Sequence, residues 1–238
     1  MSHKVVVSIV GTAGRKEDGA KLSRNVFENM KTKAEDLILK KFKLRKQDVL
    51  LVSGGSAWAD HIAVSLWLEN MYTGSPEDMY SGLRIFLPCG YDNGNTGTQF
   101  QFKQHNKRED PGTTLNRLHN QFNSTMGNGF DSLKDLLCTE ALGAELCCSF
   151  SGFLNRNIQV AKCDYMIAFT WGDSYGQPKS GGTFHTWKNC KSQNKIHVPL
   201  NTLCDQVGPI ITEPSPSGTL QLQNSSIGEK RKRNFEFN

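Results

Sequence analysis

The chain has 238 residues, of which 37% are apolar and 21% charged, and its formal net charge is +5. These values are typical of a globular protein and argue against a disordered or fibrous chain. The net positive charge lies in residues 1–50, which hold twelve Lys and Arg against six Asp and Glu, so the rest of the chain is close to neutral. A basic helix face there could attract nucleic acid or an anionic ligand, although we favour an ordinary solvated face.

The seven cysteines contain no C-x-x-C pair, and no secretory leader pattern opens the sequence. This usage predicts buried, reduced thiols in a cytoplasmic protein, while the cluster Lys230–Arg233 leaves nuclear import open. No run of about 18 apolar residues occurs, so we expect no membrane partner. The His and Cys residues lack metal-ligand spacing, so we expect neither a metal ion nor a cofactor.

The first part of the chain alternates between apolar runs and helical patterns. The run KVVVSIV (4–10), followed by GTAG, predicts a strand buried on both faces. Apolar residues at helical spacing predict a helix over residues 20–41. DVLLVSGG (48–55) predicts a second strand, residues 58–71 a second helix, and LRIFLPCG (83–90) a third strand.

The alternation breaks over residues 91–150, which we interpret as an insertion. Its first part, residues 91–112, is rich in Gly, Asn, Gln and Lys and predicts a long loop. Helical patterns follow over residues 113–126 and from Phe130 to about Cys147. The insertion could form a lid over the sheet edge or an oligomer contact, and the sequence leaves both open.

The alternation then resumes. A helical pattern covers residues 153–163, and DYMIAFTW (164–171) predicts a fourth strand. A loop leads to a helix over residues 183–192, and KIHVPL (195–200) predicts a fifth strand. Residues 213–238 are rich in Pro, Ser, Gly and Asn and predict a disordered basic tail.

This pattern predicts an α/β fold of the Rossmann-like, three-layer, doubly wound kind, with a mainly parallel sheet, helices on both faces and a helical insertion. We expect residues 1–212 to form one domain. In such sheets, ligands bind beyond the carboxyl ends of the strands. The segments GTAGR, SGGSAWAD and PKSGGT place three glycine-rich turns at that edge.

Glycine-rich turns that lead into helices can bind anions, because they offer backbone N–H groups and the positive end of a helix dipole. Neither the Walker A pattern nor G-x-G-x-x-G is present, which argues against a P-loop NTPase or an ordinary dinucleotide dehydrogenase. Two turns are expected to cradle a phosphate from opposite sides: Gly54, Gly55 and Ser56 in one, and Gly181, Gly182 and Thr183, with its hydroxyl as an added donor, in the other.

Asp60 falls in the first turn of the second predicted helix. A carboxylate there is favoured by the helix dipole, so Asp60 could simply cap the helix. In a functional role it would accept hydrogen bonds from ribose hydroxyls or a base. We expect the next residue, His61, to lie on the helix surface without a role.

Three segments together resemble the SLOG superfamily of Rossmann-like nucleotide-binding domains. They are VSGGSAWADHIA (52–63), RNIQVAKCDYMIAF (156–169) and PKSGGT (178–183). Related members are the Lonely Guy phosphoribohydrolases, the DNA-processing protein DprA and the sensory domains of TRPM channels. The resemblance covers residues 4–90 and 151–200, and it implies a nucleotide or nucleotide-derived small molecule as ligand.

The resemblance also implies the site. In Lonely Guy enzymes an Arg and a Glu serve cleavage of an N-glycosidic bond; Arg156 matches the Arg, but Thr186 stands at the Glu position. His185 or Asp60 could supply acid–base chemistry in another geometry. The implied positions are Gly11, Thr12 and Arg15 on the first loop; Ser53, Gly54, Gly55, Ser56 and Asp60 on the second; Arg156 and Asn157 before the fourth strand; and Pro178, Gly181, Gly182 and Thr183 on the last loop.

Arg156 has two interpretations. Its guanidinium suits a bidentate phosphate clamp, which we favour, but an ion pair with Asp164 would also fit. Asn157, the next residue, could orient a ribose or cap a turn. Among the aromatic residues, Tyr175 is our first candidate to stack on a base, because it lies in a glycine-rich loop. Trp171 could also stack, whereas Trp187 is expected in the core.

The sequence leaves three functions open. We favour a binding or sensing module for a nucleotide-derived ligand. The alternative is a hydrolase of an N-glycosidic or phosphate bond, with Arg156 and Asp60 as catalytic residues. A third hypothesis is DprA-like nucleic-acid binding by the basic first helix, with affinity that falls steeply with salt. Members of this fold often associate as dimers, but no residue pattern here decides whether this chain is a homodimer.

Overall fold

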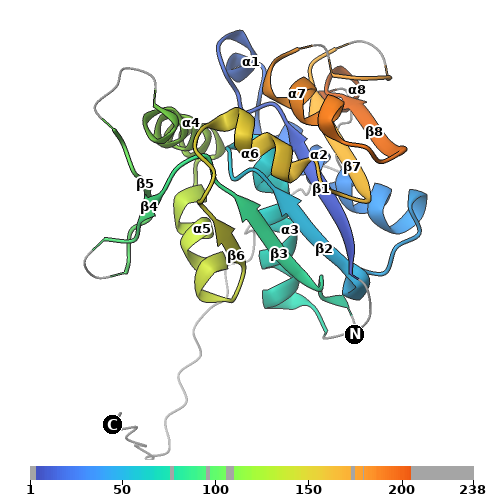
Figure 1. Ribbon diagram of the computed structural model, residues 1–238, viewed down its shortest axis with the longest axis horizontal. Coiled ribbons are helices and arrows are strands. Elements are labelled where there is room, and N and C mark those ends of the chain that lie inside the picture. The colour runs from blue at the N-terminus through green and yellow to red at the C-terminus, as the bar shows by residue number, and fades with distance from the viewer. Residues whose placement is uncertain are drawn as a thin grey trace, which may run out of the picture. The chain divides into compact units, whose positions relative to one another are not determined.

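The protein is built on a six-stranded, all-parallel sheet with the strand order β6-β3-β2-β1-β7-β8 (Figure 1). The predicted tail over residues 213–238, with Lys230–Arg233, lies outside the described residues. The computed structural model describes residues 4–75, 78–94, 97–105, 110–172, 175–178 and 180–204. The strands of the sheet are β1 (Val5–Gly11), β2 (Val49–Ser53), β3 (Gly82–Phe86), β6 (Glu145–Cys147), β7 (Tyr165–Thr170) and β8 (Asn194–Pro199).

Helices cover both faces of the sheet, so the predicted doubly wound α/β class is confirmed (Figure 1). None of the helices in the described part of the chain combines the length and apolarity needed to span a bilayer. The helices are α1 (Glu17–Ala20), α2 (Arg24–Asp36), α3 (His61–Thr73), α4 (Pro111–Met126), α5 (Ser132–Ala141), α6 (Phe153–Val160), α7 (Gly181–Asn189) and α8 (Asn201–Cys204).

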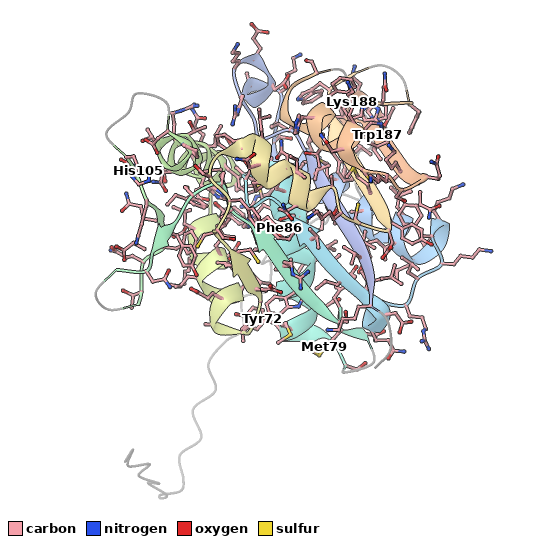
Figure 2. The ribbon with its side chains drawn as sticks, viewed as in Figure 1. Tyr72, Met79, Phe86, His105, Trp187 and Lys188 are labelled. Atoms are coloured by element: carbon pink, nitrogen blue, oxygen red, sulfur yellow. The ribbon has the colours of Figure 1, made fainter. Side chains whose placement is uncertain are left out.

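The apolar strands divide their side chains between two cores, because successive side chains of a strand point to opposite faces of the sheet. Along β1, Val7 and Ile9 join the larger core with α2, α3 and α4. Val10 faces the smaller core with α6 and α7, where Ser8 also donates to the Val160 carbonyl at 2.7 Å. Trp187 on α7 is 8% exposed and packs in the smaller core, as predicted (Figure 2).

The insertion differs from its prediction. The predicted helix from Phe130 ends at Ala141, and Glu145–Cys147 instead forms β6, a sixth strand parallel to β3. The chain turns between them at Gly143, which has a φ of 95°. Residue types other than glycine rarely adopt this angle. Three residues are too few to show a periodic pattern, which is why the sequence did not indicate this strand.

The predicted loop over residues 91–112 also contains structure. Its ends pair as a short antiparallel ladder of β4 (Tyr91–Asp92) and β5 (Gln101–Phe102), which projects away from the main sheet (Figure 1). Phe102 is fully buried and anchors this ladder, and its backbone N–H and C=O both bond the Asn116 side chain on α4.

The first two predicted helices are each interrupted. Ser23 separates α1 from α2, because its hydroxyl accepts a bond from the Val26 N–H at 3.3 Å and caps the second helix. A π-helical turn, η1 (Leu37–Lys41), follows α2, and a 3₁₀ turn, η2 (Lys46–Asp48), precedes β2. A second 3₁₀ turn, η3 (Trp58–Asp60), precedes α3 and begins at a residue with φ of 62°.

Two buried histidines fasten the insertion to the rest of the fold. His61 was expected at the surface, but it is fully buried, and its Nε2 lies 3.0 Å from Asp135 Oδ2 on α5. The insertion covers the face of α3 that the sequence pattern assigned to solvent. His119 on α4 is also fully buried and bridges Gly55 O, at 3.1 Å, and Ser132 Oγ, at 2.9 Å.

The contacts of His119 define its tautomer. The Gly55 carbonyl can only accept, so Nε2 of His119 carries the proton. Nδ1 lies 2.9 Å from Ser132 Oγ, whose proton is donated to Asn123 Oδ1 at 2.6 Å. Burial, together with the nearby His61, lowers the pKa of His119 to about 3. The neutral ring therefore holds α4 on the turn that follows β2.

This histidine should make the protein acid-sensitive. The unfolded chain takes up the His119 proton near pH 6.5, whereas the native state does so near pH 3. As the pH falls below 6.5, His119 should lower the free energy of unfolding by up to about 1.4 kcal/mol per pH unit, and it should have no such effect above pH 6.5. Urea unfolding between pH 7.5 and 4.5 measures this slope. A His119→Gln variant should show a shallower slope, and equal slopes would contradict the assignment.

Candidate functional site

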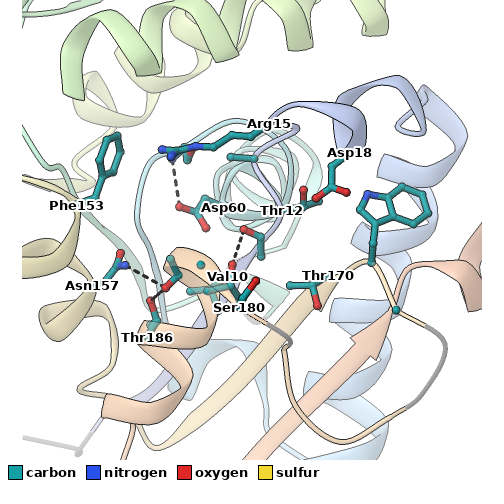
Figure 3. Close-up of a pocket in the computed structure, with 18 of the residues that line it drawn as sticks. Val10, Thr12, Arg15, Asp18, Asp60, Phe153, Asn157, Thr170, Ser180 and Thr186 are labelled. Atoms are coloured by element: carbon teal, nitrogen blue, oxygen red, sulfur yellow. Dashed lines mark hydrogen bonds between the residues drawn. The ribbon is translucent and has the colours of Figure 1, made fainter. Parts of the chain in front are cut away.

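A cavity of about 730 Å³ opens at the carboxyl edge of the sheet, beside the ends of β1 and β7 (Figure 3). The chain runs outward from β1 through β2, β3 and β6 on one side and through β7 and β8 on the other. The strand order therefore reverses between β1 and β7, which is where ligands bind in open α/β sheets. The volume lies within the range of about 300–1,000 Å³ that is usual for small-molecule sites.

The cavity brings together many of the residues predicted from the sequence. They come from four separate segments: the loop after β1, the segment around η3, helix α6 and the start of α7. The predicted residues that line it are Gly11, Thr12, Arg15, Ser56, Asp60, Arg156, Asn157, Gly181, Gly182 and Thr183.

The turn after β2 is placed differently from its prediction. Ser53, Gly54 and Gly55 are buried, and they do not line the cavity. A Cβ on Gly54 would lie 1.5 Å from an Arg156 guanidinium nitrogen, and one on Gly55 would lie 2.4 Å from Leu87. These glycines let the turn pack beneath Arg156 and against β3, and of the three residues expected to cradle a phosphate here, Ser56 is the one that lines the cavity.

The aromatic residues also differ in place from the prediction. Tyr175 is 63% exposed and does not line the cavity, whereas Trp171, the second candidate, does. Pro178, from the same loop as Tyr175, does not line it either. Phe153, at the first position of α6, is an aromatic residue of the cavity wall that no sequence motif indicated.

A buried ion pair lies at the base of the cavity. Arg156 on α6 donates to Asp60 Oδ2 at 3.3 Å, and both side chains are at least 93% buried. The same oxygen accepts the Ser56 N–H at 3.3 Å. Asp60 makes no bond that caps α3, and the alternative partner of Arg156, Asp164, instead accepts the Val6 N–H at 2.8 Å.

Burial governs the electrostatics of this pair. It raises the pKa of Asp60, an effect that the charge of Arg156 and the N–H groups of Ser56 and Gly11 oppose. It lowers the pKa of Arg156, an effect that Asp60 opposes. An arginine in a protein keeps its charge, so the guanidinium is a buried cation. Its Nε has no hydrogen-bond partner among the described residues, which leaves one donor unused beside the cavity.

Further cations and rings line the walls. The Arg15 guanidinium lies 4.9 Å from the centroid of the Phe153 ring, and Arg156 lies 5.8 Å from the same centroid. Lys21 Nζ lies 5.5 Å from the centroid of the Trp171 ring. These pairs fall in the range of cation–π contacts. Burial and the charge of Arg117 lower the pKa of Arg15, and Asp60 opposes this.

Two residues of the rim, Asp18 and Lys21, had no signal in the sequence. Both lie on or beside the short helix α1, outside the motifs described above. Phe153 and Asp18 lie on opposite sides of Asp60 (Figure 3), so the cavity extends between two walls. The spacing of the sequence motifs did not indicate that these two residues line the same cavity.

The start of α7 forms the floor of the cavity. The Thr183 hydroxyl donates to Gly11 O at 2.8 Å, so its proton is already used and it is not the added donor that we expected. Asn157 donates to Gly182 O at 3.1 Å, which is the turn contact among its two predicted roles. Thr186, at the Glu position of Lonely Guy enzymes, donates to the same carbonyl at 3.0 Å.

Fold and cavity together define a Rossmann-like α/β protein with a charged, partly aromatic cavity at the switch point of its sheet. No family model matches the chain. It is 33% identical over 201 residues to the uncharacterized protein R261 of Acanthamoeba polyphaga mimivirus, an alignment that covers 83% of this chain and 97% of the viral protein. The chain therefore belongs to the same family as this viral protein.

The contact between Gly54 and Arg156 makes Gly54→Ala a sharp test of the site. The added methyl group would overlap the guanidinium, so we expect a loss of about 1–3 kcal/mol in the free energy of unfolding, typical of overpacking. Gly90→Ala is the matched control, because its Cβ would lie 3.4 Å from the flexible Lys103 side chain. Equal stability of the two variants in urea unfolding would contradict the geometry.

The ion pair itself is tested by a double-mutant cycle. Arg156→Met leaves the Asp60 carboxylate buried without its cation, so we expect a loss of about 3–5 kcal/mol. Adding Asp60→Asn should recover part of this loss, because the buried charge is then gone. Arg84→Met, which breaks the exposed Arg84–Glu145 pair, should cost at most about 1 kcal/mol. Strict additivity of the Asp60 and Arg156 changes would show that the pair is not coupled.

Proposed function

We propose that the protein is a SLOG-type module that binds, and thereby senses, a nucleotide or nucleotide-derived ligand in the cavity beside β1 and β7. The observation that carries this proposal is the buried guanidinium of Arg156: this residue lines the cavity, and its buried Nε has no hydrogen-bond partner among the described residues. A buried donor without a partner costs free energy, and an anionic ligand would remove that cost.

The surroundings of Arg156 favour a phosphate as the anionic group. The exposed Arg15 lies over the same Phe153 ring, so a second guanidinium is available from another wall. Gly181 and Gly182 begin α7 at the cavity floor, where free N–H groups and the helix dipole favour an anion. In this proposal the phosphate lies between Arg15, Arg156 and the start of α7.

The rest of the cavity suits a ribose and a base. The Asp60 carboxylate is engaged by Arg156 and by the N–H groups of Ser56 and Gly11, and the acceptor capacity that its two oxygens retain would serve a ligand hydroxyl group. The rings of Phe153 and Trp171 offer faces on which a base could stack. This division of a cavity into a charged part and an aromatic part supports a nucleotide over a simple anion such as sulfate.

The contacts favour binding over hydrolysis. Thr186 cannot act as an acid, and Asp60 is held by its ion pair rather than directed at a leaving group. His185 does not line the cavity. A hydrolase of this geometry would have to use Asp18, the other carboxylate that lines the cavity among the described residues.

The contacts also disfavour a nucleic-acid binder. Much of the basic face on α2 and its continuation is neutralised within the chain, since Lys40 pairs with Asp36 at 2.7 Å and Lys46 with Glu35 at 2.6 Å. Lys31 pairs with two glutamates as well. In this proposal the ligand is a small molecule, and the protein is cytoplasmic, as its cysteine usage indicates. That the chain forms a homodimer stays a prediction.

Ligand-observed proton NMR tests this function directly. Purified protein would be mixed with nucleoside monophosphates, deoxynucleotides, cyclic nucleotides, NAD and ADP-ribose and followed for several hours. We expect the lines of one ligand class to broaden without product. Arg15→Gln should weaken that binding about tenfold or more, as expected for a charge-assisted hydrogen bond. Arg45→Gln, which changes an exposed arginine outside the cavity, is the matched control.

The other outcomes decide between the functions. Accumulation of a free base or sugar phosphate, stopped by Asp18→Asn, would replace binding by hydrolysis. A panel that shows no broadening at millimolar ligand would contradict the proposal, as would an equal effect of the Arg15 and Arg45 changes.

A further inference from the structure

Two cysteines meet at the C-terminal end of α7, whose other end forms the cavity floor. Cys163 precedes β7 and Cys190 follows the last residue of α7, so 27 positions separate them in the chain. Their sulfur atoms lie 3.6 Å apart, within hydrogen-bond distance for thiols. All seven cysteines of the chain lie in the described residues and are reduced, and this is the pair whose sulfur atoms are in contact.

The surroundings make the two thiols unequal. Cys163 lies next to Asp164, whose negative charge disfavours a thiolate there, and burial acts in the same direction. Cys190 lies against the Cys163 thiol, and either sulfur atom can be the donor of that contact. Cys190 also accepts from the Ser192 N–H, and the Lys195 ammonium lies nearby. Lys195 is fixed in place, because its Nζ donates to the carbonyls of Trp187 at 3.2 Å and Cys190 at 3.1 Å.

These contacts shift both titrations. The hydrogen bond from Cys163 is the largest cause that lowers the pKa of Cys190 to about 6, and the same bond raises the pKa of Cys163. These directions make Cys190 the thiol of the pair that loses its proton more readily. A thiolate is the nucleophilic form of cysteine, and oxidation follows both thiolate character and exposure. Cys190 is 4% exposed, so the oxidant that reaches it has to be small.

We propose that Cys163 and Cys190 form a dithiol modification site that hydrogen peroxide oxidises to an intramolecular disulfide. The Cys190 thiolate attacks one peroxide oxygen, the O–O bond breaks, and Cys190 becomes a sulfenic acid while the released hydroxide takes a proton. The Cys163 sulfur then attacks the Cys190 sulfur and displaces its oxygen, which leaves as water with the Cys163 proton. The two thiols lose two electrons and two protons, and one peroxide becomes two waters.

A disulfide between these cysteines would act on α7, the helix whose first residues form the cavity floor, although the proposal does not depend on any ligand. A disulfide of about 2.05 Å requires the two sulfur atoms to approach from 3.6 Å, which joins the end of α7 to the segment before β7. Helix α7 has nine residues, so its two ends are about 13 Å apart. Its other end is the cavity floor at Gly181 and Gly182, and β7 ends beside the same cavity.

Peroxide titration of the fully reduced protein tests the proposal. Free thiols would be counted by alkylation and mass spectrometry after each addition, and linked peptides would be mapped after proteolysis. We expect two of the seven thiols to disappear first, in monomeric protein, with a peptide that links Cys163 to Cys190. The Cys148→Ser variant, which lacks an exposed cysteine, is the control. In this variant Cys163 and Cys190 should be oxidised at the same peroxide dose as in the unmodified protein.

Two variants separate the roles of the sulfur atoms. Cys190→Ser should abolish the early loss of thiols, and Cys163→Ser should let a sulfenic acid accumulate at Cys190, where dimedone traps it. Circular dichroism checks that both variants fold, and the mapping of the unmodified protein decides the question if one does not. Earlier oxidation of Cys148 or Cys204 while the pair stays reduced would overturn the proposal. Irreversible oxidation of Cys190 without a linked peptide would overturn it as well.

Discussion

The ion pair between Asp60 and Arg156 is the contact on which the arrangement of the cavity depends, because it joins the two halves of the sheet across the switch point. Asp60 follows β2, Arg156 lies on α6 before β7, and 96 positions separate them. The pair is buried, so each charge is costly without the other. Gly54 accommodates the guanidinium, and the Ser56 N–H supports the carboxylate. The start of α7 is held beside these segments by the Thr183 hydroxyl, which donates to Gly11 O, and by the Asn157 amide, which donates to Gly182 O.

The insertion supports this pair through the same turn. The Gly55 carbonyl accepts from His119, while the Gly54 backbone packs under Arg156. The turn after β2 thus contacts the Arg156 cation through Gly54 and the neutral His119 ring through Gly55. The insertion is part of the structural support of the site, and it also completes the sheet through β6. Neither role is that of a mobile lid, which was one of the interpretations of the sequence.

The sequence predicted the strands of the parallel core well, because runs such as VVVSIV and YMIAF are buried on both faces and have no competing helical pattern. Glycine turns located the correct edge of the sheet. The partner of Arg156 was not predictable, since Asp164 is close in sequence while Asp60 is close only in the folded chain. His61 was misplaced for the same reason, because α5 covers it. The sequence could not show that Trp171 and not Tyr175 lines this cavity, because a glycine-rich loop indicates exposure and not which side chain faces a cavity.

The central place of β1 has a consequence for synthesis of the chain on the ribosome. Its first neighbour, β2, follows directly, but its second neighbour, β7, begins only at Tyr165, after the whole insertion. At typical translation rates of about 5–20 residues per second, more than a hundred residues correspond to roughly 5–20 s. During this interval β1 has one open, apolar edge and Asp60 lacks its cation, a combination that favours pairing with other chains. The strand at the centre of the sheet therefore has both of its edges paired only once β7 has been made.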